Sequence, residues 1–358
     1  TGGSSAINLS AVEAHALGLK YGAMAQETSA TIDGTVTLNL GGHVNAAGVL
    51  GAGSAMAIAG TANSTVTGDV SVNINSAHHK DNAVSGVVAG IVGGGSAIGT
   101  LGGTATTTVE GTTTIRIDEG TVGGVFGGGL AAAADFTDVD GLVKDVLGSI
   151  GGDGADYSDN LTFNESLLHE PGSATASSGD VLILIGGADA QGNGPSVAGV
   201  FGGGAALGYQ YGDVTKGAAA ESTVGTVTIQ IGEEGGTNPF RDENGDIDKE
   251  AKGEFFTNLK VTLTNLVEGG LSGFGTSDVI SLVNVADQPG LTALVAGGGL
   301  SLAWDRNRGT ENGTDNFASV SSTVENVNMT VLSGYNVGLI GGGVAAASGR
   351  GTEDGTPM

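Results

Sequence analysis

A glycine triplet recurs along this chain in a constant frame, and this repeat limits the folds open to the chain more than any other feature. Each copy follows a short apolar run and precedes small residues, as in "GGVFGGGLAAA" and "AGVFGGGAALG". The five copies occupy 93–95, 127–129, 202–204, 297–299 and 341–343, and a degenerate copy contains Ala52. Self-similarity of this kind is typical of repeat architectures, in which each unit stacks on the next.

One copy taken alone, "AGIVGGGSAIGT" at 89–100, has the spacing of a loose dinucleotide-binding turn. A dinucleotide fold uses that turn once and continues into a helix. Here the Thr-rich stretch "TLGGTATTTVEGTTTIRI" follows, which is a poor helix former, and the turn is repeated. We therefore interpret the glycines as packing residues, because the missing Cβ lets backbones approach closely and makes a positive φ accessible at a corner.

Thr- and Val-rich segments with period-2 alternation accompany the triplets, and this pattern predicts strands. They occupy 34–40, 69–75, 112–117, 180–185, 225–231 and 326–331. A shorter strand and a turn such as "DG" or "EG" often come first. The predicted unit is strand, turn, strand, loop and glycine strand, and the chain is predicted to be all-β. We expect a single β-solenoid of about seven Gly-rich coils over 1–358, with parallel and antiparallel pairing both open.

Two segments depart from the repeat and are predicted to be insertions. Residues 135–172 begin with apolar residues at helical spacing, from Phe136 to Leu147, which predicts an amphipathic helix. Residues 232–290 contain the acidic stretch "RDENGDIDKEAKGE" and then apolar runs, which predict a loop followed by extra strands. Residues 11–26 are a further helix candidate.

Charge and cysteine content exclude several classes of partner and site. The chain has 38 acidic and 12 basic residues, with a net charge of -26, so a nucleic-acid partner is not expected. No apolar run is long enough to predict membrane insertion. Cysteine is absent, which excludes disulfides and thiolate metal sites.

The candidate metal site lies in "DENGDID", where Asp242, Asn244, Asp246 and Asp248 alternate along the chain. Calcium prefers six to eight hard oxygen ligands, which side chains at this spacing can supply. Ile247 occupies the position at which an EF-hand would have glycine, and a solvated acidic loop is the alternative interpretation. Calcium is the one cofactor that the sequence suggests.

Other chemistry-bearing residues have weaker patterns. The stretch 151–159 is similar to one calcium-binding nonapeptide, but such sites are built by tandem copies. We expect His78 and His79 in an exposed loop, and Trp304 to cover a solenoid edge or stack on a sugar. A flat array of threonines could bind ice, but the Thr spacing is uneven in the sequence and Arg116 and Asp118 interrupt it, so β-propensity is the simpler interpretation.

Catalysis has little support in the sequence. There is no G-x-S-x-G, Walker or H-E-x-x-H motif, and no Asp-Asp or Gly-His-Gly such as β-helix polysaccharide hydrolases use. We therefore expect no enzyme activity. A carbohydrate-active β-helix enzyme and a calcium-stabilised binding module are kept as alternatives.

Units such as "TTTIRIDEGTVGGVFGGGLAAAA" and "STVENVNMTVLSGYNVGLIGGGVAAAS" resemble repeats in the passenger segments of bacterial autotransporter adhesins. The resemblance covers about two thirds of the chain and implies an exported, right-handed parallel β-helix. We accordingly expect an extracellular or cell-surface structural or adhesive protein, which could form fibres or a surface layer. The expected partners are other copies of the chain, or surface glycans or proteins.

Overall fold

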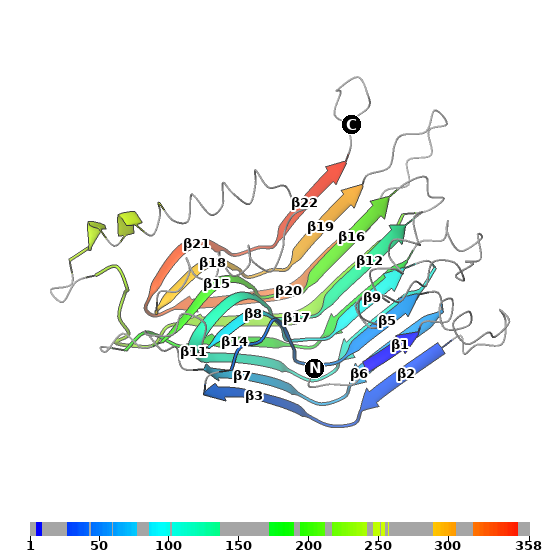
Figure 1. Cartoon of the computed structure of the whole chain (residues 1–358), viewed down its shortest axis with the longest axis horizontal. Helices are drawn as coiled ribbons and strands as arrows, with labels where there is room; N and C mark the ends of the chain where they lie inside the picture. The colour runs from blue at the N-terminus through cyan, green and yellow to red at the C-terminus, as the bar shows by residue number, and fades with distance from the viewer. Residues whose placement is uncertain are drawn as a thin grey trace, which may run out of the picture.

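In the part of the chain that the computed structural model describes, β-strands predominate (Figure 1). The described residues are 5–8, 27–42, 44–58, 60–76, 86–100, 102–136, 172–189, 194–211, 217–241, 246–250, 252–254, 257, 289–305 and 318–349. Within them, no helix is long and apolar enough to cross a membrane. The prediction of an all-β chain is therefore confirmed.

The strands form three stacks, which we call sheets A, B and C. Sheet A contains β1 (Ser5–Asn8), β5 (Ser54–Ile58), β9 (Ser96–Thr100), β12 (Leu130–Phe136), β16 (Ala205–Tyr211), β19 (Leu300–Asp305) and β22 (Val344–Gly349). Sheet C contains β4 (Val49–Leu50), β8 (Val87–Val92), the second half of β11 (Thr113–Phe126), β15 (Pro195–Phe201), β18 (Leu291–Ala296) and β21 (Tyr335–Ile340).

Sheet B is bent into two segments. Its first segment contains β2 (Glu27–Ile32), β6 (Thr61–Val66), β10 (Thr104–Val109), β13 (Ser173–Ser178) and the first halves of β17 (Ala219–Ile231) and β20 (Ser319–Val331). Its second segment contains β3 (Val36–Gly42), β7 (Val70–Ser76), the first half of β11, β14 (Val181–Ile185) and the second halves of β17 and β20.

Every pairing between these strands is parallel, which decides the question that the turns left open. The strand β2 pairs with β6 rather than with its neighbour β3, so the "DG" turn at 33–34 connects two segments of one sheet instead of closing a hairpin. The described antiparallel contacts are isolated bridges, Ala188 to Thr237 and Arg241 to Ile247. The chain passes from sheet B to C to A and back to B, and each pass adds one strand to each stack.

The glycine triplet forms the corner between sheets C and A, so the predicted single glycine strand is two strands. The triplet 127–129, for example, separates β11 in sheet C from β12 in sheet A. All five triplets belong to the described residues, and none of their glycines has a positive φ. A Cβ on Gly93 would lie 2.5 Å from the carbonyl oxygen of Gly127 and 2.7 Å from Cγ2 of Thr113. Close approach, rather than a left-handed backbone, therefore requires glycine at this corner.

The corner between sheets B and C uses glycine differently. A glycine with positive φ precedes β8, β18 and β21, and another lies within β11. These residues are Gly86, Gly120, Gly290 and Gly334, with φ of 80°, 104°, 81° and 93°. Residues other than glycine rarely adopt a positive φ, so the backbone conformation of the turn itself favours glycine here.

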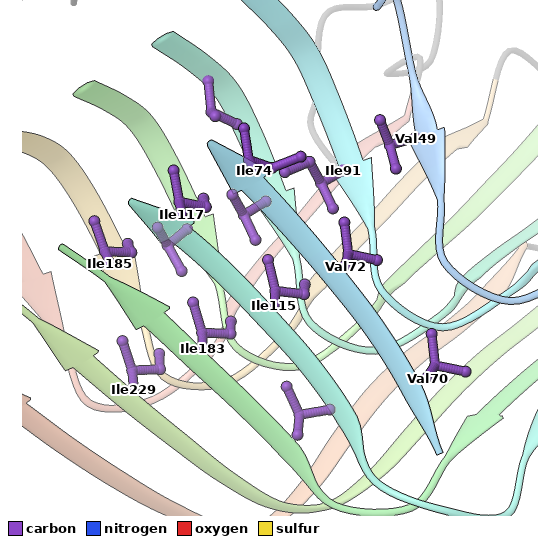
Figure 2. Packing of buried hydrophobic residues seen from close by; sticks show 14 of the residues in the cluster. Val49, Val70, Val72, Ile74, Ile91, Ile115, Ile117, Ile183, Ile185 and Ile229 are labelled. Carbon is purple, nitrogen blue, oxygen red and sulfur yellow. The ribbon is translucent and has the colours of Figure 1, made fainter. Parts of the chain in front are cut away.

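The core consists of in-register ladders of β-branched residues, because alternate residues of each strand point inward. Ile115, Ile183 and Ile229 are register neighbours on β11, β14 and β17, and all are fully buried (Figure 2). A second buried cluster, made of alanines, lies between sheet A and the first segment of sheet B. The small alanine side chains let sheet A lie close to the first segment of sheet B. The triplet corners beside them are also closely packed.

The two predicted insertions lie mostly outside the described residues. Asp135 and Phe136 belong to strand β12, where they pair with Gln210 and Tyr211, so the expectation that Phe136 begins a helix is wrong. Backbone pairing with β16 at the end of strand β12 outweighs the apolar spacing that suggested a helix. Residues 137–171 and the N-terminal helix candidate at 11–26 are outside the described part of the chain.

The segment 232–290 connects β17 to β18, and its first part is anchored to sheet C. The Phe240 ring packs edge-to-face on Tyr335 of β21, with 4.7 Å between ring centroids, and Lys252 Nζ lies 5.1 Å from the centroid of the same ring. Residues 249–250, 252–254 and 257 are helical. The extra strands expected further along fall outside the described residues.

Candidate functional site

The predicted calcium loop is only partly described. Asp242 and Asn244 lie outside the described residues, whereas Asp246 and Asp248 are exposed. An Asp248 carboxylate oxygen accepts a hydrogen bond from the Glu250 backbone N–H at 3.0 Å, which is the geometry of a helix N-cap. The Asp248 backbone N–H donates to the Phe240 carbonyl oxygen at 2.9 Å. Asp248 therefore has a structural role at the start of the helical residues.

Of the other predicted site residues, Trp304 alone lies in the described part of the chain. His78, His79 and 151–159 lie outside the described residues, and Trp304 lies on β19 with its backbone paired to Tyr209 and Ser348. Within the described part of the chain, no group of three or more His, Cys, Asp or Glu side chains is arranged to hold a metal ion.

The most regular exposed feature is the outer surface of the first segment of sheet B, which we call the hydroxyl face. Its members are the outward residues of six parallel strands, because alternate residues there point into the alanine cluster. From β2 to β20 they are Glu27, Ser29 and Thr31; Thr61, Asn63 and Thr65; Thr104, Thr106 and Thr108; Ser173, Thr175 and Ser177; Ala219, Glu221 and Thr223; and Ser319, Ser321 and Thr323.

The hydroxyl face is aligned in straight columns across the six strands. One column consists entirely of hydroxyl residues: Thr31, Thr65, Thr108, Ser177, Thr223 and Thr323. Fourteen of the eighteen outward residues carry a hydroxyl, so the surface is polar with little charge. Thr223 Oγ1 donates to Ser177 Oγ at 3.2 Å within this column, and Asn63 Nδ2 donates to Glu27 Oε1 at 3.0 Å beside it.

The charged residues Arg116 and Asp118 lie on the neighbouring surface rather than on the hydroxyl face, whose charged members are Glu27 and Glu221. Arg116 and Asp118, which the sequence placed within the threonine array, lie on β11 in the second segment of sheet B. Arg116 Nε is 2.8 Å from an Asp118 carboxylate oxygen, and this hydrogen bond is the main cause that raises the Arg116 pKa above its ordinary value. The pair is exposed and stabilises the fold little. On the same segment Asn73 Nδ2 donates to Asn39 Oδ1 at 2.9 Å.

Sequence reasoning missed this face because it compared the threonines by their spacing along the chain. Insertions between the units change that spacing without changing the register. The signal that reveals the columns is the inward-facing β-branched apolar residue just before each turn, such as Ile32, Val66 or Val109. Counting back one residue from it gives Thr31, Thr65 and Thr108.

Comparison of the chain with protein-family models, with curated proteins and with solved structures finds no match.

Proposed function

We propose that the chain is a single-stranded, right-handed parallel β-helix of about seven coils that serves as an extracellular structural or adhesive protein on the bacterial surface. Seven strands in sheet A and six-strand ladders in sheets B and C support the coil number. Parallel crossover connections are almost always right-handed, which supports the handedness. The resemblance of the glycine units to autotransporter passengers supports the location.

The observation that carries the adhesive role is the hydroxyl face. It is an extended, ordered surface in a chain with 38 acidic residues, yet Glu27 and Glu221 are the charged side chains among its eighteen outward residues. A partner that docks there meets hydroxyl donors and acceptors without the repulsion that the rest of an acidic surface produces. Surface glycans, surface proteins and other copies of the chain are the partners proposed.

Binding of the purified chain to immobilised glycans, to bacterial and host cells, and to itself tests this function. Two variants probe the site: Thr108→Tyr with Thr223→Tyr on the hydroxyl face, and Thr114→Tyr with Thr228→Tyr on the second segment of sheet B. Each pair makes the same chemical change on outward, register-aligned positions of two strands that are separated by one strand of the sheet. We expect the first pair to reduce binding at least tenfold and the second to leave it unchanged. A wild-type chain that binds none of these surfaces would refute the adhesive role.

Calcium-stabilised binding stays a proposal for the loop that contains Asp242, Asn244, Asp246 and Asp248. A melting temperature that is the same in calcium and in chelator would exclude it. Because Asp248 caps the helical residues, Asp246→Asn is the better probe of metal binding, since it leaves the cap intact.

A further inference from the structure

The hydroxyl face is periodic in two directions, and this regularity identifies the kind of partner that it fits. Neighbouring strands in a sheet lie about 4.8 Å apart, and outward residues recur about 6.7 Å apart along each strand. The five strand pairings beneath the face match residue for residue, without a bulge or a register shift. The outward side chains therefore form a lattice rather than a scatter of polar groups.

The threonine side chain makes this lattice rigid. Nine of the outward residues are threonines, in which branching at Cβ restricts χ1, so few orientations are open to their hydroxyl and methyl groups before any partner binds. Hydrogen bonds along a column, such as Thr223 to Ser177, restrict the hydroxyls further. A preorganised surface loses little side-chain entropy on binding, which favours a partner that must be contacted at many points at once.

The chemistry of the face argues against anionic polymers, ligands that stack on aromatic rings, and single small ligands. Among the eighteen outward residues there is no lysine, arginine or aromatic side chain, so the face offers neither a cation for an anionic polymer nor a ring for stacking. Small-ligand sites are concave and enclose most of the ligand, whereas these residues lie on the outer side of a sheet. An extended partner with uncharged donors and acceptors at regular points matches these properties.

We propose that the hydroxyl face binds ice. Ice repeats in two dimensions and presents a hydrogen-bond donor or acceptor at every lattice point, as the hydroxyl columns do. Both sequence objections to this activity are removed, because the threonines align in register and Arg116 and Asp118 lie on the other segment of sheet B. The inference goes beyond the proposed adhesive function, because it assigns to the same face a partner that is not among those proposed there.

Ice-affinity partitioning and thermal hysteresis of the full chain test the inference. We expect a slowly growing ice hemisphere to incorporate the fluorescently labelled wild-type chain. We also expect a solution of the wild-type chain to show measurable thermal hysteresis. Thr108→Tyr with Thr223→Tyr should lower both at least fivefold, because two bulky rings raise the centre of the face and prevent flat contact. Thr114→Tyr with Thr228→Tyr should keep both near the wild-type level. Circular dichroism melts verify that each variant is folded.

Two results would overturn the inference: exclusion of the wild-type chain from ice, or an equal loss of activity in both variant pairs. Pull-down on crystalline cellulose and chitin and on cells, done in parallel, separates this failure from failure of the proposed function. Binding to those surfaces without binding to ice would retain the adhesive role and reject ice as the partner. Binding to nothing would reject both proposals.

Discussion

At the scale of single residues, glycine has two distinct structural uses in this chain, and a third set of glycines has neither. The four triplets from 93–95 to 297–299 need a missing Cβ, whereas Gly86 and Gly120 need a positive φ. Gly124, on the outer side of sheet C, has no atom within 4 Å of a hypothetical Cβ and no positive φ. Glycine content alone therefore does not indicate which positions tolerate substitution.

We predict opposite effects for two alanine substitutions three residues apart. In Gly127→Ala the new Cβ would meet the Gly202 carbonyl oxygen and lie 2.5 Å from Val181 Cγ1, so we expect a loss of about 1–3 kcal/mol from overpacking. Gly124→Ala should be neutral or stabilise by up to about 1 kcal/mol, because it restricts the unfolded chain. Chemical denaturation of both variants measures the difference. Equal losses would show that the triplet is not under steric constraint.

At the scale of secondary-structure elements, side-chain hydrogen bonds join neighbouring coils in addition to the backbone pairing of their strands. The turn between the two segments of sheet B illustrates this. The carboxylate of Asp69 accepts a hydrogen bond from the Thr112 backbone N–H at 2.8 Å, and that of Asp180 accepts one from the Thr226 N–H at 2.8 Å. Acidic turn residues thus satisfy amide groups one coil further along, which gives part of the acidic composition a structural role.

Stacking also predicts that the same residue matters more inside the stack than at its described end. Val227 and Val327 are register partners on β17 and β20, but Val227 is fully buried while Val327 is half-buried. We expect Val227→Ala to cost about 2 kcal/mol, from roughly 0.8 kcal/mol per buried methylene plus a cavity. Val327→Ala should cost less than half as much. Urea unfolding compares the two, and equal costs would contradict the stacking argument.

At the scale of the whole molecule, one-sided charge opposes the compact state. The chain has a net charge of -26, and its successive coils lie about 4.8 Å apart, so like charges come near one another and repel, and salt screens this repulsion. The described strands tolerate this because their buried faces are apolar and the outward hydroxyls are neutral.

We therefore predict that the melting temperature at pH 7 rises when sodium chloride is increased from about 0.01 to 0.15 M, which shortens the Debye length from about 30 to about 8 Å. Differential scanning calorimetry measures the shift. The control is the same salt series near pH 4.1, the isoelectric point, where the response should largely disappear. If salt raised the melting temperature equally at both pH values, the stabilisation would not come from screening of the net charge.

Much of the fold could be predicted from the repeat in the sequence, whereas most of the candidate site could not. Alternation in "GTVTIQI" or "DVSVNIN" identified strands because a half-buried strand needs apolar residues at every second position. The prediction that a helix begins at Phe136 was wrong, because Phe136 ends strand β12 and pairs with β16. The spacing of apolar residues along the chain does not reveal this pairing. The loop around Asp242 and Asn244 stays a prediction.

The sequence by itself determined the alternating strand pattern and the repetition of similar units, because side-chain volume and backbone freedom act within a few residues. The tertiary structure alone decided that the strands pair in parallel, that the triplets separate two sheets, and that threonines from six distant segments form one lattice. Pairing register depends on hydrogen bonds between residues tens of positions apart. Insertions hide that register in the linear sequence, and the folded sheet restores it.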